Sequence, residues 1–319
     1  MTSAGLDPDA RAFLERVEAL GVPGFGDVPV DEARRLQDEA SPGLFGPLVE
    51  VPFEDRSLPG AAGRIPVRVY RAGEDPAPVL VYFHGGGWVL GSIRTAHGVC
   101  ATLARLAGCV VCSVDYRLAP EHVFPAALED AWAATTWVAK HADEVGGLPG
   151  PPAVGGDSAG GNLAAVCALR ARDAGLSLPL QVLVYPITDA DFGTPSYREF
   201  AEGYYLTASG MRWFWDNYLP DGDRFDPDVS PLRTADVAGV APALVITAEY
   251  DVLRDEGEAY ARRLEEAGVT TRLERYDGLI HGFLRMPAVI ARANGALESA
   301  AAGLRASFAG AFGPDQPTA

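Results

Sequence analysis

The sequence has little positive charge. Its 319 residues contain 26 lysines and arginines against 43 aspartates and glutamates, for a formal net charge of −17, and Lys140 is the only lysine. A surface of this sign repels phosphate backbones and anionic membranes. The composition therefore argues against a nucleic-acid or membrane partner and favours a small-molecule substrate.

Cysteine is also scarce. The four cysteines, Cys100, Cys109, Cys112 and Cys167, are too few for a disulfide scaffold of this length. Cys109 and Cys112 have the spacing of a redox or zinc pair, but they lie in an apolar run that is typical of a buried strand. Residues three apart on a strand face opposite ways. We therefore expect both to be packed in the core, and we expect no metal site.

Long hydrophobic stretches are absent as well. No segment approaches the roughly 20 apolar residues that a membrane-spanning helix needs. Residues Met1–Asp7 contain neither the basic segment nor the apolar core of a signal peptide. The resulting expectation is a soluble, cytoplasmic protein.

Short apolar runs alternate with longer helical patterns along most of the chain. Hydrophobic residues make up 48% of it, which is enough for a sizeable core. The predicted strands are Leu48–Phe53, Ile65–Tyr70, Val79–Phe83, Val110–Val114, Pro152–Gly155, Leu180–Tyr185, Ala243–Ala248 and Thr271–Tyr276. The predicted helices between and after them are Thr95–Leu106, Ala126–His141, Gly160–Arg172, Glu256–Ala267 and Ala288–Phe308. This pattern indicates an α/β fold with a mostly parallel sheet, helices on both faces and an antiparallel edge made by the first two strands.

Two segments fall outside this alternation. Residues 1–45 carry helical patterns over Pro8–Leu20 and Val30–Glu39, and residues 186–240 interrupt the sheet. We expect both segments to lie over the same edge of the sheet as a helical cap. The chain then divides into cap residues 1–45 and 186–240 and core residues 46–185 and 241–319.

The second cap segment contains a stripe of large side chains. Met211, Phe214, Trp215 and Tyr218 are spaced as one face of a helix. We expect most of them to pack the cap on the core. Trp213 lies off this stripe, so we expect it to face either solvent or the pocket, and in the pocket it would be a candidate for contact with the substrate.

The strongest motif is Gly156-Asp157-Ser158-Ala159-Gly160, between a predicted strand and a predicted helix. A serine at a sharp strand-to-helix turn holds its hydroxyl clear of the backbone. The flanking glycines remove Cβ atoms that would crowd the turn, and the helix N-terminus directs unpaired N–H groups at the reacting carbon. Ser158 is therefore the predicted nucleophile.

A second motif, His-Gly-Gly-Gly-Trp at residues 84–88, directly follows a predicted strand. Successive glycines let the backbone approach a ligand with bare N–H groups, which can hold an oxyanion together with the N–H of Ala159. A flexible turn explains the motif equally well by itself, but the nearby serine turn favours the oxyanion interpretation. We expect His84 to anchor this loop, and Trp88 is a second candidate for substrate contact.

Chain order points to the base. Sites built on such a serine turn place the acid and then the histidine after the nucleophile. His281 is the only histidine after Ser158, and we place it in a loop just after the predicted strand Thr271–Tyr276, at the sheet edge that carries the serine turn. The others are expected to be structural or solvated: His84, His97, His122 and His141.

The acid must lie between these two residues, after a strand. The segment that follows Ala243–Ala248 offers four carboxylates: Glu249, Asp251, Asp255 and Glu256. We expect Asp255 to form a capping box with Glu258, and Glu256 to lie in the first turn of the helix. Glu249 remains an alternative, and Asp251 is preferred because it lies in the loop with room to reach an imidazole.

Together these motifs resemble those of the hormone-sensitive-lipase-like family of bacterial carboxylesterases. The resemblance is carried by His84–Trp88, Asp115–Glu121, Phe124–Ala127, Gly156–Gly160, Asp251–Glu256 and His281–Phe283. It implies the α/β-hydrolase fold, with an eight-stranded sheet and a helical cap, and esters of short-to-medium acyl chains as substrates. It also implies the triad Ser158, Asp251 and His281. The implied oxyanion donors are Gly86, Gly87 and Ala159, with Gly85 as a less favoured fourth. Members of the family are often dimers, so the resemblance allows a homodimer.

The predicted activity is two-step acyl transfer by a serine carboxylesterase without a metal or organic cofactor, since the sequence has neither a His-Glu-x-x-His motif nor a phosphate loop. An amidase or deacetylase acting on a small N-acyl compound would use the same residues. A non-catalytic small-molecule receptor would share only the fold. An interfacial lipase is disfavoured by the acidic chain and by the lack of a long amphipathic lid.

Overall fold

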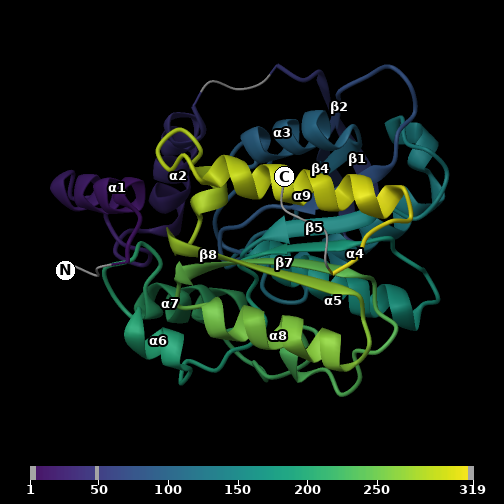
Figure 1. Cartoon of the computed structure of the whole chain (residues 1–319). Helices are drawn as coiled ribbons and strands as arrows, with labels where there is room; N and C mark the ends of the chain where they lie inside the picture. Colours follow the sequence, from purple (N-terminus) through teal and green to yellow (C-terminus); the bar gives the residue numbers. More distant parts are fainter. Residues whose placement is uncertain (1–4, 47–49, 315–319) are drawn as a thin grey trace.

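The computed structural model describes residues 5–46 and 50–314. At its centre lies an eight-stranded sheet with the strand order β1-β2-β4-β3-β5-β6-β7-β8 (Figure 1). The strands are β1 (Phe53–Gly60), β2 (Gly63–Arg71), β3 (Val79–Phe83), β4 (Val110–Val114), β5 (Ala153–Asp157), β6 (Gln181–Val184), β7 (Ala243–Tyr250) and β8 (Thr271–Ile280).

The sheet is parallel except at one edge. β2 pairs antiparallel with β1 and with β4, and the strands from β4 through β8 all run parallel. Strands β3, β4, β5 and β6 are buried along their whole length, because the sheet is covered on both faces. The predicted α/β class, the mostly parallel eight-stranded sheet and its antiparallel edge are confirmed.

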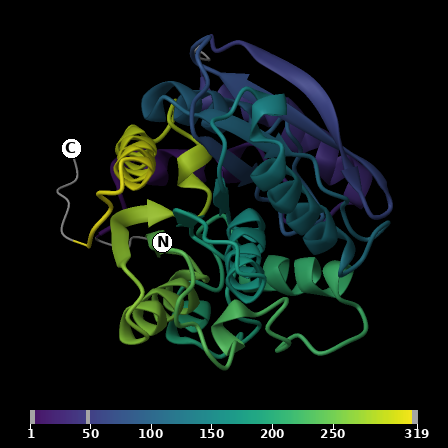
Figure 2. The same ribbon diagram turned by 90° about the vertical axis from the view of Figure 1, so that its right-hand side faces the viewer.

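Helices lie on both faces of the sheet (Figures 1 and 2). α3 (His97–Ala107) and α9 (Ala293–Phe308) contact each other on one face, and α4 (Ala126–Lys140), α5 (Ala159–Asp173) and α8 (Arg254–Glu266) cover the other. The remaining helical elements are α1 (Pro8–Ala19), α2 (Val30–Phe45), α6 (Pro195–Glu199), α7 (Ala208–Tyr218), and the short 3-10 turns η1 (Ala142–Val145), η2 (Pro231–Arg233) and η3 (Phe283–Arg285). Within the described residues, no helix is both long and apolar enough to cross a bilayer.

The first strand is not where the sequence predicts it. β1 begins at Phe53, where the predicted strand Leu48–Phe53 ends; residues 50–52 form no strand, and residues 48 and 49 lie outside the described residues. β1 is an edge strand with mostly exposed or half-buried side chains. Its polar sequence therefore lacks the apolar run on which the prediction was based.

Two helical predictions also need correction. The last helix, predicted over Ala288–Phe308, begins only at Ala293, because the residues before it form turns in which the N–H groups of Val289 and Ile290 bond to the carbonyl of Met286. The five-residue helix α6 was not predicted, since so short an element has no measurable periodicity.

The two segments expected to form the cap contact each other. The ring of Tyr205 lies 5.5 Å from that of Phe13 in α1 and 5.6 Å from that of Phe25, between centroids. Phe25 also lies 5.2 Å from Phe214 in α7. The boundaries between cap and core remain a prediction.

The aromatic stripe of α7 is buried, as expected for a packing surface. Met211, Phe214, Trp215 and Tyr218 are at most 3% exposed. Tyr218 stacks on Trp88, with ring centroids 4.2 Å apart and an interplanar angle of 7°. This stack joins α7 to the glycine loop that follows β3.

All four cysteines are free and buried in the described structure. Burial raises the pKa of Cys109 and of Cys112 to about 12, so both remain protonated thiols at neutral pH. The predicted core packing of the Cys-x-x-Cys pair is thereby confirmed.

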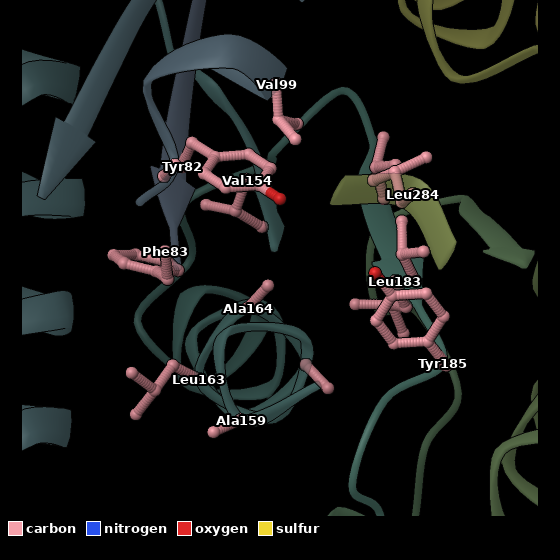
Figure 3. Packing of buried hydrophobic residues seen from close by; sticks show 14 of the residues in the cluster. Tyr82, Phe83, Val99, Val154, Ala159, Leu163, Ala164, Leu183, Tyr185 and Leu284 are labelled. Carbon is pink, nitrogen blue, oxygen red and sulfur yellow. The ribbon is translucent and has the colours of Figure 1, made fainter. Parts of the chain in front are cut away.

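Close packing of α5 against the sheet positions the serine turn. Figure 3 shows Ala159, Leu163 and Ala164 on this helix, with Phe83 close by. A Cβ atom at Gly160 would overlap the carbonyl oxygen of Phe83. Only a glycine at this position lets the helix begin so close to the end of β3, which brings the serine turn beside the glycine loop.

Candidate active site

Ser158 lies between β5 and α5 in a strained conformation. Its backbone has φ 56° and ψ −118°, a combination that costs a non-glycine residue about 1–3 kcal/mol. The turn is fixed because the Ser158 N–H donates to the carbonyl of Val184 at 2.8 Å. The residue is buried, with 6% of its surface exposed.

His281 faces this hydroxyl. Its Nε2 lies 3.1 Å from Ser158 Oγ. The loop predicted before His281 is wrong, because β8 continues through Ile280, beyond an irregularity in its pairing with β7 at Ala248 and Tyr250. The imidazole therefore projects directly from the end of a strand.

Asp251 completes a continuous hydrogen-bonded chain. Its Oδ2 lies 2.7 Å from His281 Nδ1, and its Oδ1 accepts the N–H of Leu253 at 3.0 Å. Asp251 and His281 are 1% and 6% exposed. The alternative acid, Glu249, is turned away from His281 and accepts the N–H of Gly278 at 2.7 Å.

The predicted capping box at the start of α8 is wrong. The helix begins at Arg254, and no side chain caps it. Asp255 instead accepts the backbone N–H of Ser196 at 2.8 Å, and Glu258 pairs with Arg275. Both carboxylates therefore bind partners that lie far away in the sequence.

Glu256 lies in the first turn of α8, as predicted, but it is buried rather than solvated. Its Oε1 accepts the N–H groups of Thr188 at 2.8 Å and Asp189 at 3.2 Å. Burial raises the pKa of this carboxyl well above its ordinary value. Glu256 therefore braces the segment that follows β6.

The glycine loop offers two free N–H groups beside the serine. Within the described residues, no protein acceptor is bonded to the N–H of Gly86, Gly87 or Ala159. The prediction for Gly85 differs, because its N–H donates to Asp157 Oδ1 at 2.9 Å and is not free for an oxyanion. Gly86 and Gly87 have φ values of 131° and 60°, which glycine adopts without strain.

His84 anchors this loop. Its ring stacks on Tyr116 with centroids 4.3 Å apart, and its Nδ1 lies 3.0 Å from the carbonyl oxygen of Gly85. Burial lowers the pKa of His84, which favours the neutral ring. Both observations agree with the predicted structural role.

A cavity of about 820 Å³ lies beside these loops. Its walls come mainly from residues 6–44, that is from α1, the loop after it and α2, and from Tyr204 and Tyr205. Leu90 reaches it from the glycine loop, and Arg285 and Met286 reach it from the segment after His281. Ser158 is not among the residues that line the cavity, whose lining includes residues from the loops on both sides of the site.

The two tryptophans proposed as substrate contacts lie outside this cavity lining. Trp88 has no exposed surface and is stacked on Tyr218, which favours a packing role. Trp213 is half-buried and packs against Phe214, with centroids 5.1 Å apart. A Cβ atom at Gly26, in the loop after α1, would lie 3.0 Å from the Trp213 ring. The sequence carries no periodic signal that would have singled out Leu90, Tyr205 or Arg285 instead.

In the part of the chain that the structure describes, no group of three or more histidine, cysteine, aspartate or glutamate side chains is arranged to hold a metal ion. The groups that meet at Ser158 are an alcohol, an imidazole, a carboxylate and backbone N–H donors. Such a set can activate the alcohol as a nucleophile and stabilise a tetrahedral oxyanion.

Comparisons with known proteins agree with this chemistry. A family model described as the alpha/beta hydrolase fold matches residues 80–285. The chain is 46% identical to the "Carboxylic ester hydrolase LipN" of Mycobacterium tuberculosis, over 88% of this chain and 77% of that protein. It is 41% identical to the "Ethyl acetate hydrolase" of Pseudomonas putida, over 91% and 95% of the two chains.

Solved structures give the same result. An ester-hydrolase, EH1AB1, from the metagenome of Lake Arreo, solved in complex with a derivative of bipyridine phosphonate, superimposes with a TM-score of 0.92 at 42% identity. The match covers 95% of this chain and 99% of that one.

Proposed function

We propose that this chain, which belongs to the α/β-hydrolase fold family, hydrolyses esters of short-to-medium acyl chains with Ser158 as nucleophile. Its membership of the hormone-sensitive-lipase-like branch and its activity as a carboxylic ester hydrolase follow from relatives that are named esterases and match most of its length. The proposal concerns the residues that do the chemistry and the range of esters. It rests above all on the continuous chain from Asp251 through His281 to Ser158, with distances of 2.7 and 3.1 Å.

In the first step, His281 Nε2 accepts the proton of Ser158 as Oγ attacks the ester carbonyl. Asp251 holds the proton of the imidazole on Nδ1 and stabilises the imidazolium that forms. The carbonyl oxygen becomes an oxyanion, which accepts hydrogen bonds from the N–H groups of Gly86, Gly87 and Ala159. When the tetrahedral intermediate collapses, His281 gives its proton to the leaving alcohol.

In the second step, water takes the place of the alcohol. His281 accepts a proton from the water as the water oxygen attacks the acyl-enzyme carbonyl, and the same N–H groups hold the second oxyanion. Collapse then releases the carboxylic acid, and the proton returns to Ser158 Oγ. The enzyme ends the cycle unchanged.

The acyl range follows from the shape of the site. The adjoining cavity of about 820 Å³ has an apolar lining that includes Leu14, Leu44, Leu90 and Met286. A relative of similar length is named for the hydrolysis of ethyl acetate, an ester of a two-carbon acid. We expect acetyl esters to fit, and the cavity to favour chains several carbons longer, because each buried CH₂ contributes about 0.8 kcal/mol.

The test is Ser158→Ala, with Ser57→Ala on the edge strand β1 as a matched control. We expect Ser158→Ala to lower kcat on p-nitrophenyl esters by at least ~10⁴-fold and to lose covalent labelling by an alkyl phosphonate, seen as a missing mass increment. Ser57→Ala should keep both. Undiminished turnover by folded Ser158→Ala refutes the assignment.

The same assay measures the acyl range. The wild-type protein is compared on esters from acetyl to dodecanoyl, beside one matched amide. A maximum of kcat/KM between about four and eight carbons is expected. Faster turnover of the amide than of its ester would identify an amidase instead.

A further inference from the structure

Asp157, the residue before the nucleophile, joins three parts of the site. Its Oδ1 accepts the hydroxyl of Tyr82 at 2.8 Å and the N–H of Gly85 at 2.9 Å. Its Oδ2 lies 3.4 Å from Nε of Arg285, four residues after His281. Strand β3, the glycine loop and the segment after the base therefore meet at one carboxylate.

The carboxylate of Asp157 is buried, so its negative charge needs a positive partner nearby. Asp157 is 1% exposed, and a carboxylate that is buried without a counter-charge strongly destabilises a fold. Arg285 supplies the counter-charge, with a side chain that is 14% exposed. Burial alone would lower the pKa of Arg285, but the pKa is raised, because the charge of Asp157 and the hydroxyls of Tyr185, Tyr205 and Tyr82 together outweigh the burial. The guanidinium of Arg285 therefore stays charged next to Asp157.

The two ends of the pair act on different loops. On one side, the bond to Gly85 fixes the peptide just before Gly86 and Gly87, whose N–H groups are the proposed oxyanion donors. On the other, Arg285 ends the short turn η3, whose first residues follow His281, and its N–H bonds to the carbonyl of Gly282 at 3.1 Å.

We propose that Asp157 and Arg285 form a positioning pair that keeps the oxyanion donors and the imidazole of His281 in register with Ser158. The pair does not touch the reacting atoms; it acts through Gly85 on the donors and through η3 on the base. The inference rests on the proposed function, because it assumes the roles given there to Ser158, His281 and the glycine loop. A misplacement of about 1 Å in such a constellation costs on the order of 10²-fold in rate.

The pair is tested by Asp157→Asn, Arg285→Met and the double variant, with Arg170→Met as a control. Asp157→Asn keeps an oxygen for Tyr82 and Gly85 but removes the charge that faces Arg285. Arg285→Met keeps most of the volume and leaves the carboxylate without its partner. Arg170, on α5, pairs with Asp228 at 2.7 Å, so its replacement removes a more exposed arginine–aspartate ion pair that lies away from these loops.

Each single variant is expected to lower kcat about 10- to 100-fold with KM nearly unchanged, and to weaken a trifluoromethyl ketone transition-state analogue by the same factor. The double variant should be no worse than the worse single variant, because it removes the unpaired charge together with its partner. Arg170→Met should keep wild-type kinetics. Melting temperatures are recorded for all four, so that a loss of folded protein is separated from a loss of turnover.

Three results would overturn the pair. The first is a wild-type kcat in both folded single variants. The second is a fold-loss of kcat in the double variant that equals the product of the fold-losses in the single variants. The third is a raised KM with unchanged kcat in Arg285→Met, which would make Arg285 a substrate contact in the cavity. If Asp157→Asn does not fold, Arg285→Lys decides: it retains the charge and should recover part of the turnover lost in Arg285→Met, and an equal loss refutes the pair. Ser158→Ala separates failure of the pair from failure of the proposed function. It is inactive if only the pair is wrong, and it is active if the proposed function itself is wrong.

Discussion

The two oxygens of Asp251 have different partners, and this predicts the outcome of Asp251→Asn in detail. Oδ1 accepts the N–H of Leu253 at 3.0 Å, and Oδ2 faces His281 Nδ1 at 2.7 Å. An asparagine keeps its amide oxygen toward Leu253, since the opposite orientation would set two N–H donors against each other. Its NH₂ group then faces Nδ1, which accepts only if the imidazole proton moves to Nε2. That proton would point at Ser158, and the base would lose its free lone pair.

The expected loss follows from this tautomer. Holding the imidazole in the wrong tautomer lowers kcat by about 10⁴-fold, which corresponds to about 5.5 kcal/mol of transition-state stabilisation. KM should change little, because Asp251 is buried behind the imidazole. The measurement is kcat and KM on a p-nitrophenyl ester at neutral pH, with circular dichroism to verify that the variant is folded.

Glu249→Gln is the matched control. Glu249 lies near the end of β7, two residues before Asp251, and was the competing candidate for the acid. Its carboxylate accepts the N–H of Gly278, and a glutamine oxygen can keep this bond. We expect its kcat within about twofold of wild type. An active Asp251→Asn beside an inactive Glu249→Gln would refute the assignment of the acid.

Three further predictions follow from single contacts. Gly87→Ala should lower both stability and kcat, because the new Cβ would overlap the ring of Phe214 and because the backbone φ of 60° at residue 87 disfavours alanine. Adding Phe214→Leu should recover part of the loss, as measured by esterase activity and melting temperature. Burial raises the pKa of Glu256, so the contribution of Glu256 to stability is present at low pH and is lost as the pH rises above 4.5, the ordinary pKa of a glutamate. In urea unfolding between pH 5 and 8, the free energy of unfolding of wild type should fall relative to that of Glu256→Gln by up to ~1.4 kcal/mol per pH unit. The hydrogen bond from Arg34 lowers the pKa of Glu121 to about 2, so the contribution of Glu121 to stability is present above pH 4.5 and is lost as the pH falls toward 2. Because the pair is largely exposed, Glu121→Gln should lower the free energy of unfolding by less than about 1 kcal/mol at pH 7. The same difference between wild type and Glu121→Gln at pH 7 and at pH 2 would contradict this.

The proximity of Ser158, His281 and Asp251 could be predicted from the sequence because the signals that mark these residues are local. Ser158 is marked by the glycines around it, and His281 and Asp251 by their places after strands and by their order along the chain. Parallel strands end at the same edge of a sheet, so residues that follow different strands meet there. The chain needs no further long-range information to bring these three side chains together.

The failures concern side chains whose partners lie far away in sequence. Asp255 has the spacing of a helix cap, but its carboxylate accepts the N–H of Ser196 instead. The three glycines of residues 85–87 look equivalent in sequence, and only the bond to Asp157 shows that the N–H of Gly85 is already used. A spacing rule cannot anticipate such partners, because they depend on how separate segments pack.

The proposed catalytic groups and the walls of the cavity come from different parts of the chain. The groups that meet at Ser158 come from strand ends of the core, whereas the cavity beside them is walled mainly by residues 6–44 together with Tyr204 and Tyr205. Leu90, Arg285 and Met286 also line the cavity, from the glycine loop and from the segment after His281. Substitutions in the α1 and α2 walls should therefore shift acyl preference while the distances from Asp251 to His281 and Ser158 stay the same. A change at Arg285 should affect turnover as well, because this side chain also faces the carboxylate behind the nucleophile.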